Sequence, residues 1–160
     1  MLIRYPKMIK ENTKIKEQCL NIDIAPTILN LAGIETPSYM QGESMVNLLE
    51  GKKEKSWRDA ILFEYYVDSY WPYAGPNQIA VRTENYKLVD AFLDNDIDEL
   101  YDLKKDPGEM NNLINVEGYD KIEEELRNEA TKLKKQYKYN PNRDWWLKKV
   151  MKSKRKNQKK

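Results

Sequence analysis

Four short runs rich in strand-forming residues follow one another through the middle of the chain. They span Ala60–Tyr66, Ile79–Arg82, Tyr86–Val89 and Glu99–Leu103. Runs of this length and composition are typical of strands. The connection Thr83–Asn85 has the length of a tight turn, and short connections favour antiparallel pairing. The pattern therefore predicts an antiparallel sheet of three or four strands.

A long amphipathic helix is predicted after the sheet, over about Tyr119–Tyr137. Its apolar positions recur every three or four residues, which places them on one face of the helix. They are Ile122, Leu126, Ala130, Leu133 and Tyr137. Acidic residues occupy the first turns and lysines the last, an order that complements the helix dipole. Such a helix needs an apolar sheet to cover, so the fold class is α+β.

A first helix is predicted before the sheet, within Asn21–Ile34. Asp23 can cap it, Pro26 is tolerated in its first turn, and Gly33 can adopt the left-handed conformation that ends it. Four apolar residues are expected on its buried face. They are Ile24, Ile28, Leu31 and Ala32.

Two shorter elements are predicted on either side of this helix. A helix is expected over about Ser44–Leu49, ending at Gly51. Leu2–Tyr5, followed by Pro6, has the composition of the end of a strand, and four residues cannot make a stable sheet edge alone. The chain is therefore expected to begin in mid-fold, with an edge that favours aggregation unless a partner covers it. The first residues lack the pattern of a secretory signal, so any such signal is expected upstream.

The composition is that of a soluble globular protein, with 40% hydrophobic and 34% charged residues. The length of 160 residues fits one domain. Charge is distributed unevenly, because residues 148–160 hold eight Lys and Arg and no acid. The rest of the chain has 20 basic and 26 acidic residues, a net charge of −6. We expect a basic, disordered tail over residues 141–160, with nucleic-acid or anionic-membrane binding as the alternative.

Two absences limit the chemistry available to this chain. It contains no histidine, the side chain most used for proton transfer near neutral pH and the commonest metal ligand. Cys19 is the single cysteine, which excludes an intrachain disulfide and a multi-cysteine zinc site. Two acidic runs, Asp94–Asp98 and Asp106–Glu109, are expected to be turns. The first lacks the Gly and Glu of a calcium loop, and the second contains Pro-Gly.

Five segments, in chain order, resemble segments of the sulfatase family. They are Asn21–Ile34, Gln41–Leu49, Trp57–Tyr65, Val81–Leu88 and Glu99–Leu113. The last is the most specific, since it is similar to the C-terminal signature of these enzymes. The resemblance covers roughly Leu2–Tyr137, and the region resembled is the C-terminal domain of the N-sulphoglucosamine sulphohydrolase type.

The family resemblance implies the end of an alkaline-phosphatase-like α/β core followed by a smaller subdomain. In that subdomain a four-stranded antiparallel sheet packs against a long C-terminal helix, in agreement with the hydrophobic pattern. Residues 1–56 are then expected to be the tail end of the core domain. Residues 57–140 are expected to be the C-terminal subdomain, followed by the basic tail.

The resemblance also implies that the catalytic groups precede this segment. Family sulfatases attack sulfur with a formylglycine made from a Cys/Ser-x-Pro-x-Arg motif, beside a calcium ion. Cys19 is followed by neither the Pro nor the Arg, and Tyr139–Arg143 has both but offers Tyr as nucleophile. The chain is therefore expected to bind no cofactor and to be inactive alone. Calcium and formylglycine are expected only in a full-length family member.

Candidate substrate contacts come from one loop and one strand. Three aromatic residues share a loop with two prolines: Tyr70, Trp71 and Tyr73. Such rings can stack on sugar faces, or they can cover the sheet. Arg82 can bind a sulfate or carboxylate through its planar guanidinium, or form an ion pair within the fold. Trp145 and Trp146 can pack on the body of the protein or contact a membrane or nucleic acid.

The sequence favours the C-terminal portion of a sulfatase that completes the core and shapes one wall of the substrate pocket. The expected partners are the N-terminal sulfatase core and, at the pocket rim, a sulfated glycan or other sulfate ester. No nucleic-acid or membrane partner is expected. Two alternatives remain open. One is a stand-alone interaction protein derived from a sulfatase, and the other is part of a related phosphoester or phosphonate hydrolase. The localisation is left open, although full-length relatives are often exported.

Overall fold

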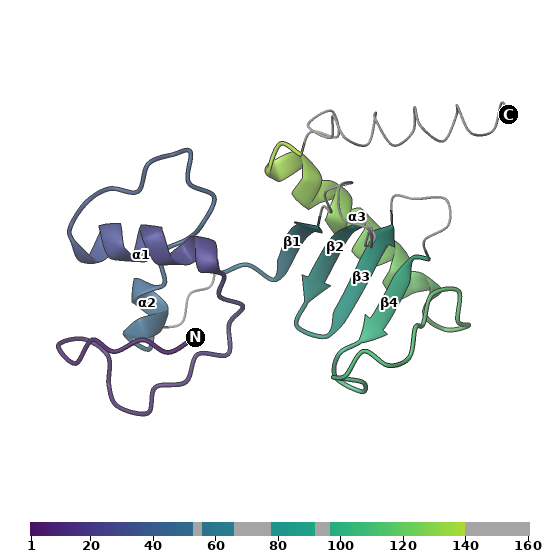
Figure 1. The fold of residues 1–160 in the computed structure, drawn as a ribbon, viewed down its shortest axis with the longest axis horizontal. Helices are drawn as coiled ribbons and strands as arrows, with labels where there is room; N and C mark the ends of the chain where they lie inside the picture. The colour runs from purple at the N-terminus through teal and green to yellow at the C-terminus, as the bar shows by residue number, and fades with distance from the viewer. Residues whose placement is uncertain (53–55, 66–77, 92–96, 140–160) are drawn as a thin grey trace, which may run out of the picture. The chain divides into compact units, whose positions relative to one another are not determined.

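The computed structural model (Figure 1) describes residues 1–52, 56–65, 78–91 and 97–139 of the chain. The chain divides into two units, Met1–Asp59 and Ala60–Lys160. Each unit has its own hydrophobic core. Within the described ranges, none of the helices has the length and hydropathy needed to span a bilayer.

The C-terminal unit contains the predicted antiparallel sheet. Its strands are β1 (Ala60–Tyr65), β2 (Gln78–Thr83), β3 (Tyr86–Ala91) and β4 (Glu99–Asp102). Their spatial order, β1-β2-β3-β4, is also their order along the chain, and each pairs antiparallel with the next. The prediction of four antiparallel strands is confirmed, with boundaries within two residues of those expected.

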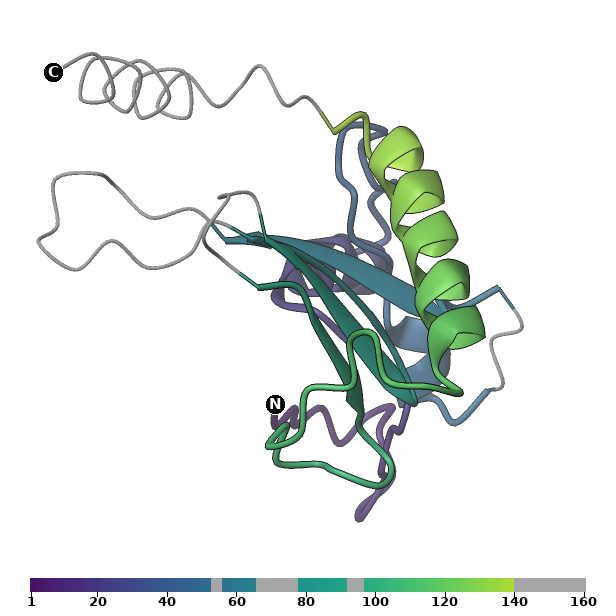
Figure 2. The ribbon, with the colours of Figure 1, turned by 90° about the vertical axis from the view of Figure 1, so that its right-hand side faces the viewer.

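Helix α3 (Asp120–Gln136) lies across one face of this sheet, as Figure 2 shows. Its residues Leu126, Ala130 and Leu133 are buried against one side of the strands. The buried strand residues in this cluster are Ala60, Val81, Leu88 and Leu100, with Ile122 and Tyr137 packed beside them. The predicted apolar face of the helix and the α+β fold class are therefore confirmed.

The outer edge of β4 is closed by the chain segment that follows it. The Leu100 N–H donates to the Asn112 side-chain carbonyl at 3.0 Å, and the Leu100 carbonyl accepts from the Leu113 N–H at 2.8 Å. The Asn112 amide also donates to the Asp98 carbonyl at 3.0 Å. These bonds satisfy backbone groups that an edge strand would otherwise leave unpaired.

The N-terminal unit is built from short helices and extended segments. It contains a 3₁₀ turn, η1 (Asn21–Asp23), followed by α1 (Ile24–Leu31) and α2 (Val46–Leu49). Gly33 and Gly51, after these two helices, have φ angles of +71° and +76°, as the predicted helix ends require. The hydrophobic core consists of Met45, Leu48, Leu49 and Trp57.

The predicted buried face of α1 is wrong. Ile24, Ile28 and Leu31 are 41%, 60% and 41% exposed, and Ala32 is exposed as well. The buried residues of this helix are Pro26 and Thr27, on its other side. The reason is that the helix packs on its own unit through hydrogen-bonding residues, so its apolar side points outward.

No described segment of this chain pairs with Leu2–Tyr5. That this segment ends a strand of a larger sheet stays a prediction. The prediction for Asp23 needs correction. Asp23 stands at the N-cap position of α1, yet its carboxylate makes no capping hydrogen bond to that helix. It bonds to groups from other parts of the unit instead.

Gly42 is required by a close approach of two backbone segments. A Cβ at this position would overlap the carbonyl of Ile22 and lie 3.0 Å from the N–H nitrogen of Asp23. Backbone cannot move aside as a flexible side chain can, so we expect Gly42→Ala to lower the free energy of unfolding of this unit by about 1–3 kcal/mol. Urea unfolding measures the change. Gly108→Ala is the control, because its nearest neighbour would be the Met110 side chain at 3.5 Å. Equal stability of the two variants would contradict the prediction.

Candidate functional site

The most buried charged group of the N-terminal unit is the carboxylate of Asp23. Its side chain is 0% exposed and that of Arg58 is 6% exposed. The two form a bidentate pair, with Arg58 Nη1 at 2.5 Å from Oδ2 and Nη2 at 2.7 Å from Oδ1. The carboxylate also accepts the N–H groups of Leu20 at 2.7 Å and Glu43 at 2.9 Å. The arrangement joins three segments that are distant in the sequence.

Neighbouring groups hold Arg58 and Asp23 in their charged forms. The guanidinium lies over the Trp57 ring at 4.7 Å and donates to the Gln18 carbonyl. Burial by itself raises the pKa of Asp23, but the hydrogen bonds from Arg58, Glu43 and Leu20 outweigh it and bring that pKa below its ordinary value. A carboxylate held ionised and enclosed on all sides cannot exchange protons with a substrate, so this cluster is structural.

Cys19 lies in the same unit and lacks the properties of a nucleophile. Burial, with a smaller contribution from the negative charge of Asp23, raises the pKa of its thiol above the ordinary value. The thiolate is the reactive form of cysteine. The environment therefore agrees with the sequence context, in which the formylglycine motif is absent.

Arg82, the one predicted contact residue within the described ranges, lies on the face of the sheet opposite α3 and is exposed. Alternation along β2 directs Ile79 and Val81 toward α3 and Arg82 to the opposite face. Its neighbours across the strands are Ile61 and Lys87. Among the residues that the structure describes, Arg82 has no ion-pair partner. Its guanidinium is exposed and available for an anion.

The aromatic residues Tyr70, Trp71 and Tyr73 lie outside the described residues. The segment that holds them leaves the sheet after Tyr65 and returns at Gln78. Arg82 is four residues further along β2, about 13 Å from that end at the rise of an extended strand. The strand therefore places the base of this segment and Arg82 toward opposite ends of one sheet face.

Sequence reasoning missed a polar cluster on the same face. Lys87 pairs with Glu109 and lies over the Tyr101 ring at 5.7 Å, while the Tyr101 hydroxyl donates to Glu99 at 3.0 Å. Burial, with the hydrogen bond to Glu99, raises the pKa of Tyr101 to about 12. Lys87 and Tyr101 are cross-strand partners, a relation that becomes visible once the register is known. In this cluster the charge of Lys87 is paired with Glu109. The neighbouring cation, Arg82, is exposed and has no described acid as partner.

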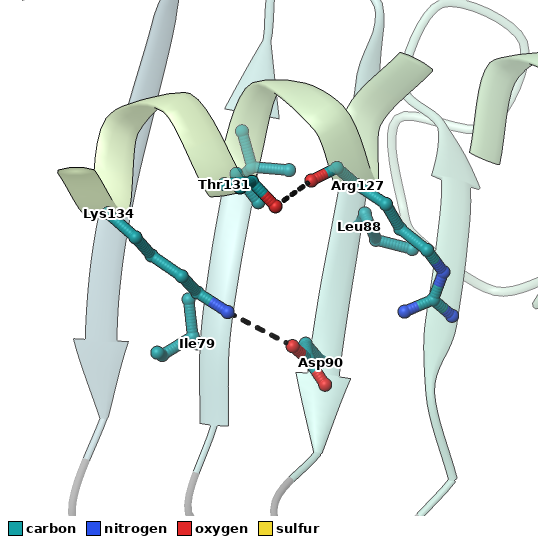
Figure 3. Close-up of a pocket in the computed structure, with 8 residues that line it drawn as sticks. Ile79, Leu88, Asp90, Arg127, Thr131 and Lys134 are labelled. Carbon is teal, nitrogen blue, oxygen red and sulfur yellow. Dashed lines mark hydrogen bonds and ion pairs between the residues drawn. The ribbon is translucent and has the colours of Figure 1, made fainter. Parts of the chain in front are cut away.

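A cavity of about 220 Å³ lies between α3 and the covered face of the sheet, as Figure 3 shows. It is lined by Ile79, Val81, Leu88, Asp90, Arg127, Ala130, Thr131 and Lys134. Lys134 pairs with Asp90 at 3.2 Å across the opening. Arg127 pairs with Asp98 at 2.7 Å and with Glu123 at 2.8 Å. Both cations are engaged with acids of the protein, so the cavity has no free charge for an anionic ligand.

The residues that the structure describes do not fit the calcium and formylglycine of family sulfatases. In the described part of the chain, no group of three His, Cys, Asp or Glu side chains could hold a metal ion. Asp98 accepts from the Ala91 N–H and pairs with Arg127. Asp106 accepts the N–H groups of Met110 and Asn111 at 2.8 Å each. Both acids therefore have structural roles, as predicted for the turn at Asp106, and no catalytic step is assigned to them.

A four-stranded antiparallel sheet covered by a C-terminal helix is the arrangement expected of the C-terminal region of an alkaline-phosphatase-like hydrolase. The family model for the C-terminal region of N-sulphoglucosamine sulphohydrolase matches residues 1–136. The chain belongs to this sulfatase family and corresponds to its C-terminal part.

Several characterised proteins are similar to this chain. The N-acetylglucosamine-6-O-sulfatase of Bacteroides thetaiotaomicron is 39% identical over 144 residues, and the match covers 88% of this chain and 25% of the enzyme. The delta 4,5-hexuronate-2-O-sulfatase of the same organism is 35% identical, over 74% of this chain and 25% of the enzyme. The chain thus spans about a quarter of the length of these relatives.

Solved structures agree with the sequence comparison. One is a complex with its substrate D-glucosamine-2-N,6-O-disulfate. It superposes with a TM-score of 0.81 at 37% identity, covering 89% of this chain and 29% of that one. The phosphonate monoester hydrolase of Agrobacterium radiobacter gives a TM-score of 0.61 at 25% identity, covering 72% of this chain and 24% of that one.

Proposed function

We propose that this chain acts as the C-terminal part of a sulfuric ester hydrolase, completing the core and forming one wall of the substrate pocket. The observation that carries the proposal is the 39% identity to a sugar sulfatase over 88% of the chain. In this proposal residues 1–56 are the tail end of the core domain. Residues 57–140 are the C-terminal subdomain and residues 141–160 a basic tail. The nucleophile and the metal ligands belong to the part of the enzyme outside this chain.

The face of the sheet opposite α3 is the part of the subdomain that we assign to the pocket wall. Arg82 supplies an exposed guanidinium there, and a planar guanidinium can bind a sulfate or carboxylate through two parallel hydrogen bonds. Phe63 and Tyr65, on the same face, are 39% and 55% exposed. Exposed aromatic rings beside a cation suit a sugar that carries an anionic group. Tyr70, Trp71 and Tyr73 are proposed to extend the same surface.

The proposed substrate class is a sulfated amino sugar. The N-acetylglucosamine-6-O-sulfatase matches this chain at higher identity than the phosphonate monoester hydrolase, over a larger share of it. The solved complex contains a sulfated glucosamine. These similarities favour a sulfate ester over a phosphonate, which is the second candidate because a phosphonate hydrolase shares the fold.

A chimera tests this function. The first three-quarters of the N-acetylglucosamine-6-O-sulfatase are joined to this chain in place of the enzyme's own matching region. We expect the chimera to release sulfate from N-acetylglucosamine-6-sulfate and the isolated 160-residue chain to release none, because the isolated chain lacks the nucleophile. Ion chromatography measures the sulfate. Turnover by the isolated chain, a preference of the chimera for a phosphonate monoester, or a folded but inactive chimera would each refute the proposal.

The contribution of Arg82 to substrate binding is measured in the same chimera. We expect Arg82→Ala to raise KM about tenfold, since a hydrogen bond to a charged group contributes roughly 1.5–3 kcal/mol. Arg82→Lys should recover part of this loss, because it keeps the charge without the planar geometry. Lys104→Ala, at another exposed cation, is the control and should leave KM unchanged. An unchanged KM in Arg82→Ala would remove this residue from the pocket wall.

A further inference from the structure

Helix α1 uses its hydrogen-bonding side within its own unit. The Thr27 hydroxyl accepts the Met45 N–H at 2.9 Å and donates to the Asp23 carbonyl at 2.6 Å. The Asn30 side-chain carbonyl accepts from the Ser44 hydroxyl at 3.0 Å. A soluble helix normally buries its apolar side and exposes its polar side. In this helix the arrangement is reversed.

The side left exposed is aliphatic and carries no charge. Ile24, Ile28 and Leu31 follow one another at spacings of four and three residues, which places them in one row. Ile22 and Ile34, at the two ends, are 48% and 55% exposed. We call these five residues the α1 stripe. The acid within this segment, Asp23, is buried and paired with Arg58, so nothing charged interrupts the stripe.

Isolated apolar residues on a surface need no explanation, whereas a contiguous row of large ones marks an interaction site. The hydrophobic periodicity of α1 is that of a buried helix, yet nothing in its own unit buries it. The partner therefore lies outside this unit. It must present an apolar surface, because a charged surface would lose its hydration against Ile and Leu without compensation.

Two partners from outside this chain can be compared by size, the catalytic part of the enzyme and a second copy. The chain covers about a quarter of its sulfatase relatives, so three-quarters of such an enzyme are available to bind the stripe. A second copy of this chain would pair two eight-residue helices, each about 12 Å long. Such a contact falls far short of the roughly 800 Å² per partner of a stable interface. The stripe therefore suits the larger partner.

We infer that the α1 stripe is the docking surface for the N-terminal, catalytic part of the sulfatase. The inference rests on the proposed function and adds the residues through which the two parts join. In this assembly α1 is covered on both sides. Its hydrogen-bonding side contacts the rest of its own N-terminal unit, and its aliphatic side contacts the catalytic part of the enzyme.

Thiol labelling tests the inference without adding a charge. Ile28→Cys is introduced both into the isolated chain and into the active chimera described above, and maleimide labelling is followed by peptide mass. We expect the labelling rate at position 28 to fall at least about tenfold in the chimera, because a buried thiol is inaccessible to the reagent. Met110→Cys is the matched control, since Met110 is 81% exposed and outside the stripe. Its labelling rate should be the same in both proteins.

A charged variant provides a second measurement. Ile28→Glu should leave the melting temperature of the isolated chain within about 2 °C, as exposed substitutions do, and lower that of the chimera by about 5 °C or more. Met110→Glu should change the melting temperature of neither the isolated chain nor the chimera.

The outcomes separate this inference from the proposed function. An active chimera in which position 28 labels as fast as in the isolated chain overturns the docking surface alone. Protection that appears in the isolated chain as its concentration rises assigns the stripe to a second copy and also overturns it. A chimera that folds without activity counts against the proposed function, whichever way position 28 behaves.

Discussion

Asp23→Ala is expected to lower the free energy of unfolding of the N-terminal unit by about 3–5 kcal/mol, because it removes the buried counter-ion of Arg58 and leaves the carboxylate of Glu43, 45% exposed and 4.0 Å away. The Arg58 side chain is 6% exposed and cannot reach bulk water without disrupting its contact with Trp57. The N–H groups of Leu20 and Glu43 also lose their acceptor. Urea unfolding monitored by tryptophan fluorescence measures the change. A loss of less than about 1 kcal/mol would show that the pair is not enclosed in solution.

The pH dependence of the same unfolding experiment tests whether the ionised carboxylate of Asp23 causes the stabilisation. The pKa of Asp23 is lowered on folding, so its stabilisation is present above the ordinary value of 3.8 and is lost as the pH falls through the folded value. The difference between wild type and Asp23→Ala should therefore be constant near neutral pH and shrink below about pH 4. Glu50→Gln is the control, because its partner Lys52 is 65% exposed. It should change stability by less than about 1 kcal/mol at any pH.

Leu100→Ala is expected to destabilise the C-terminal unit by about 2–5 kcal/mol. Leu100 is 0% exposed and belongs to the cluster formed by the sheet and α3. Truncation removes apolar contacts from that cluster and leaves a cavity. The loss of helical circular dichroism during urea unfolding, to which α3 contributes the longest helix among the described residues, measures the change.

Two matched variants test whether the loss of stability comes from lost packing of a buried side chain. Leu100→Met nearly conserves volume and should lower stability by less than about 1.5 kcal/mol. Ile97→Ala removes an aliphatic side chain that is 69% exposed and should change stability by no more than about 0.5 kcal/mol. If Leu100→Ala were no more destabilising than Ile97→Ala, Leu100 would not be a core residue in solution.

The C-terminal unit was predictable because its signals are local and agree with one another. The strand runs end at turn residues, and the apolar positions of α3 recur at a helical period over four turns. The cluster that these positions form contains the residues expected from the pattern, from Ile122 to Tyr137. Here the partner that covers the helix is the sheet immediately before it in the chain.

The N-terminal unit shows where local reasoning fails. Ile24, Ile28 and Leu31 have the spacing of a buried helical face, but periodicity does not say which surface does the burying. The cap assigned to Asp23 was wrong for a related reason. Arg58 lies 35 residues away in the sequence and donates two hydrogen bonds to the carboxylate. Such long-range pairs have no local signal.

For the candidate site, the sequence limits the available chemistry more directly than it places contacts. The chain contains no His, and Cys19 lacks the Pro and Arg of the formylglycine motif. Arg82 was predicted either as a substrate contact or as a member of an ion pair within the fold. The structure shows that it is exposed and that no described acid pairs with it, and its role as a contact stays a prediction. The roles of Lys87 and Tyr101 depend on cross-strand pairing, which the sequence alone does not specify.

The order of the strands has a consequence for how the C-terminal unit acquires its structure. Each strand pairs with the next one along the chain, so most contacts close short loops, and the entropy lost in closing them is small. Local pairing of this kind is associated with faster folding than the pairing of distant strands. During synthesis the sheet can therefore assemble hairpin by hairpin as it leaves the ribosome, and α3 completes it once its last turn has emerged.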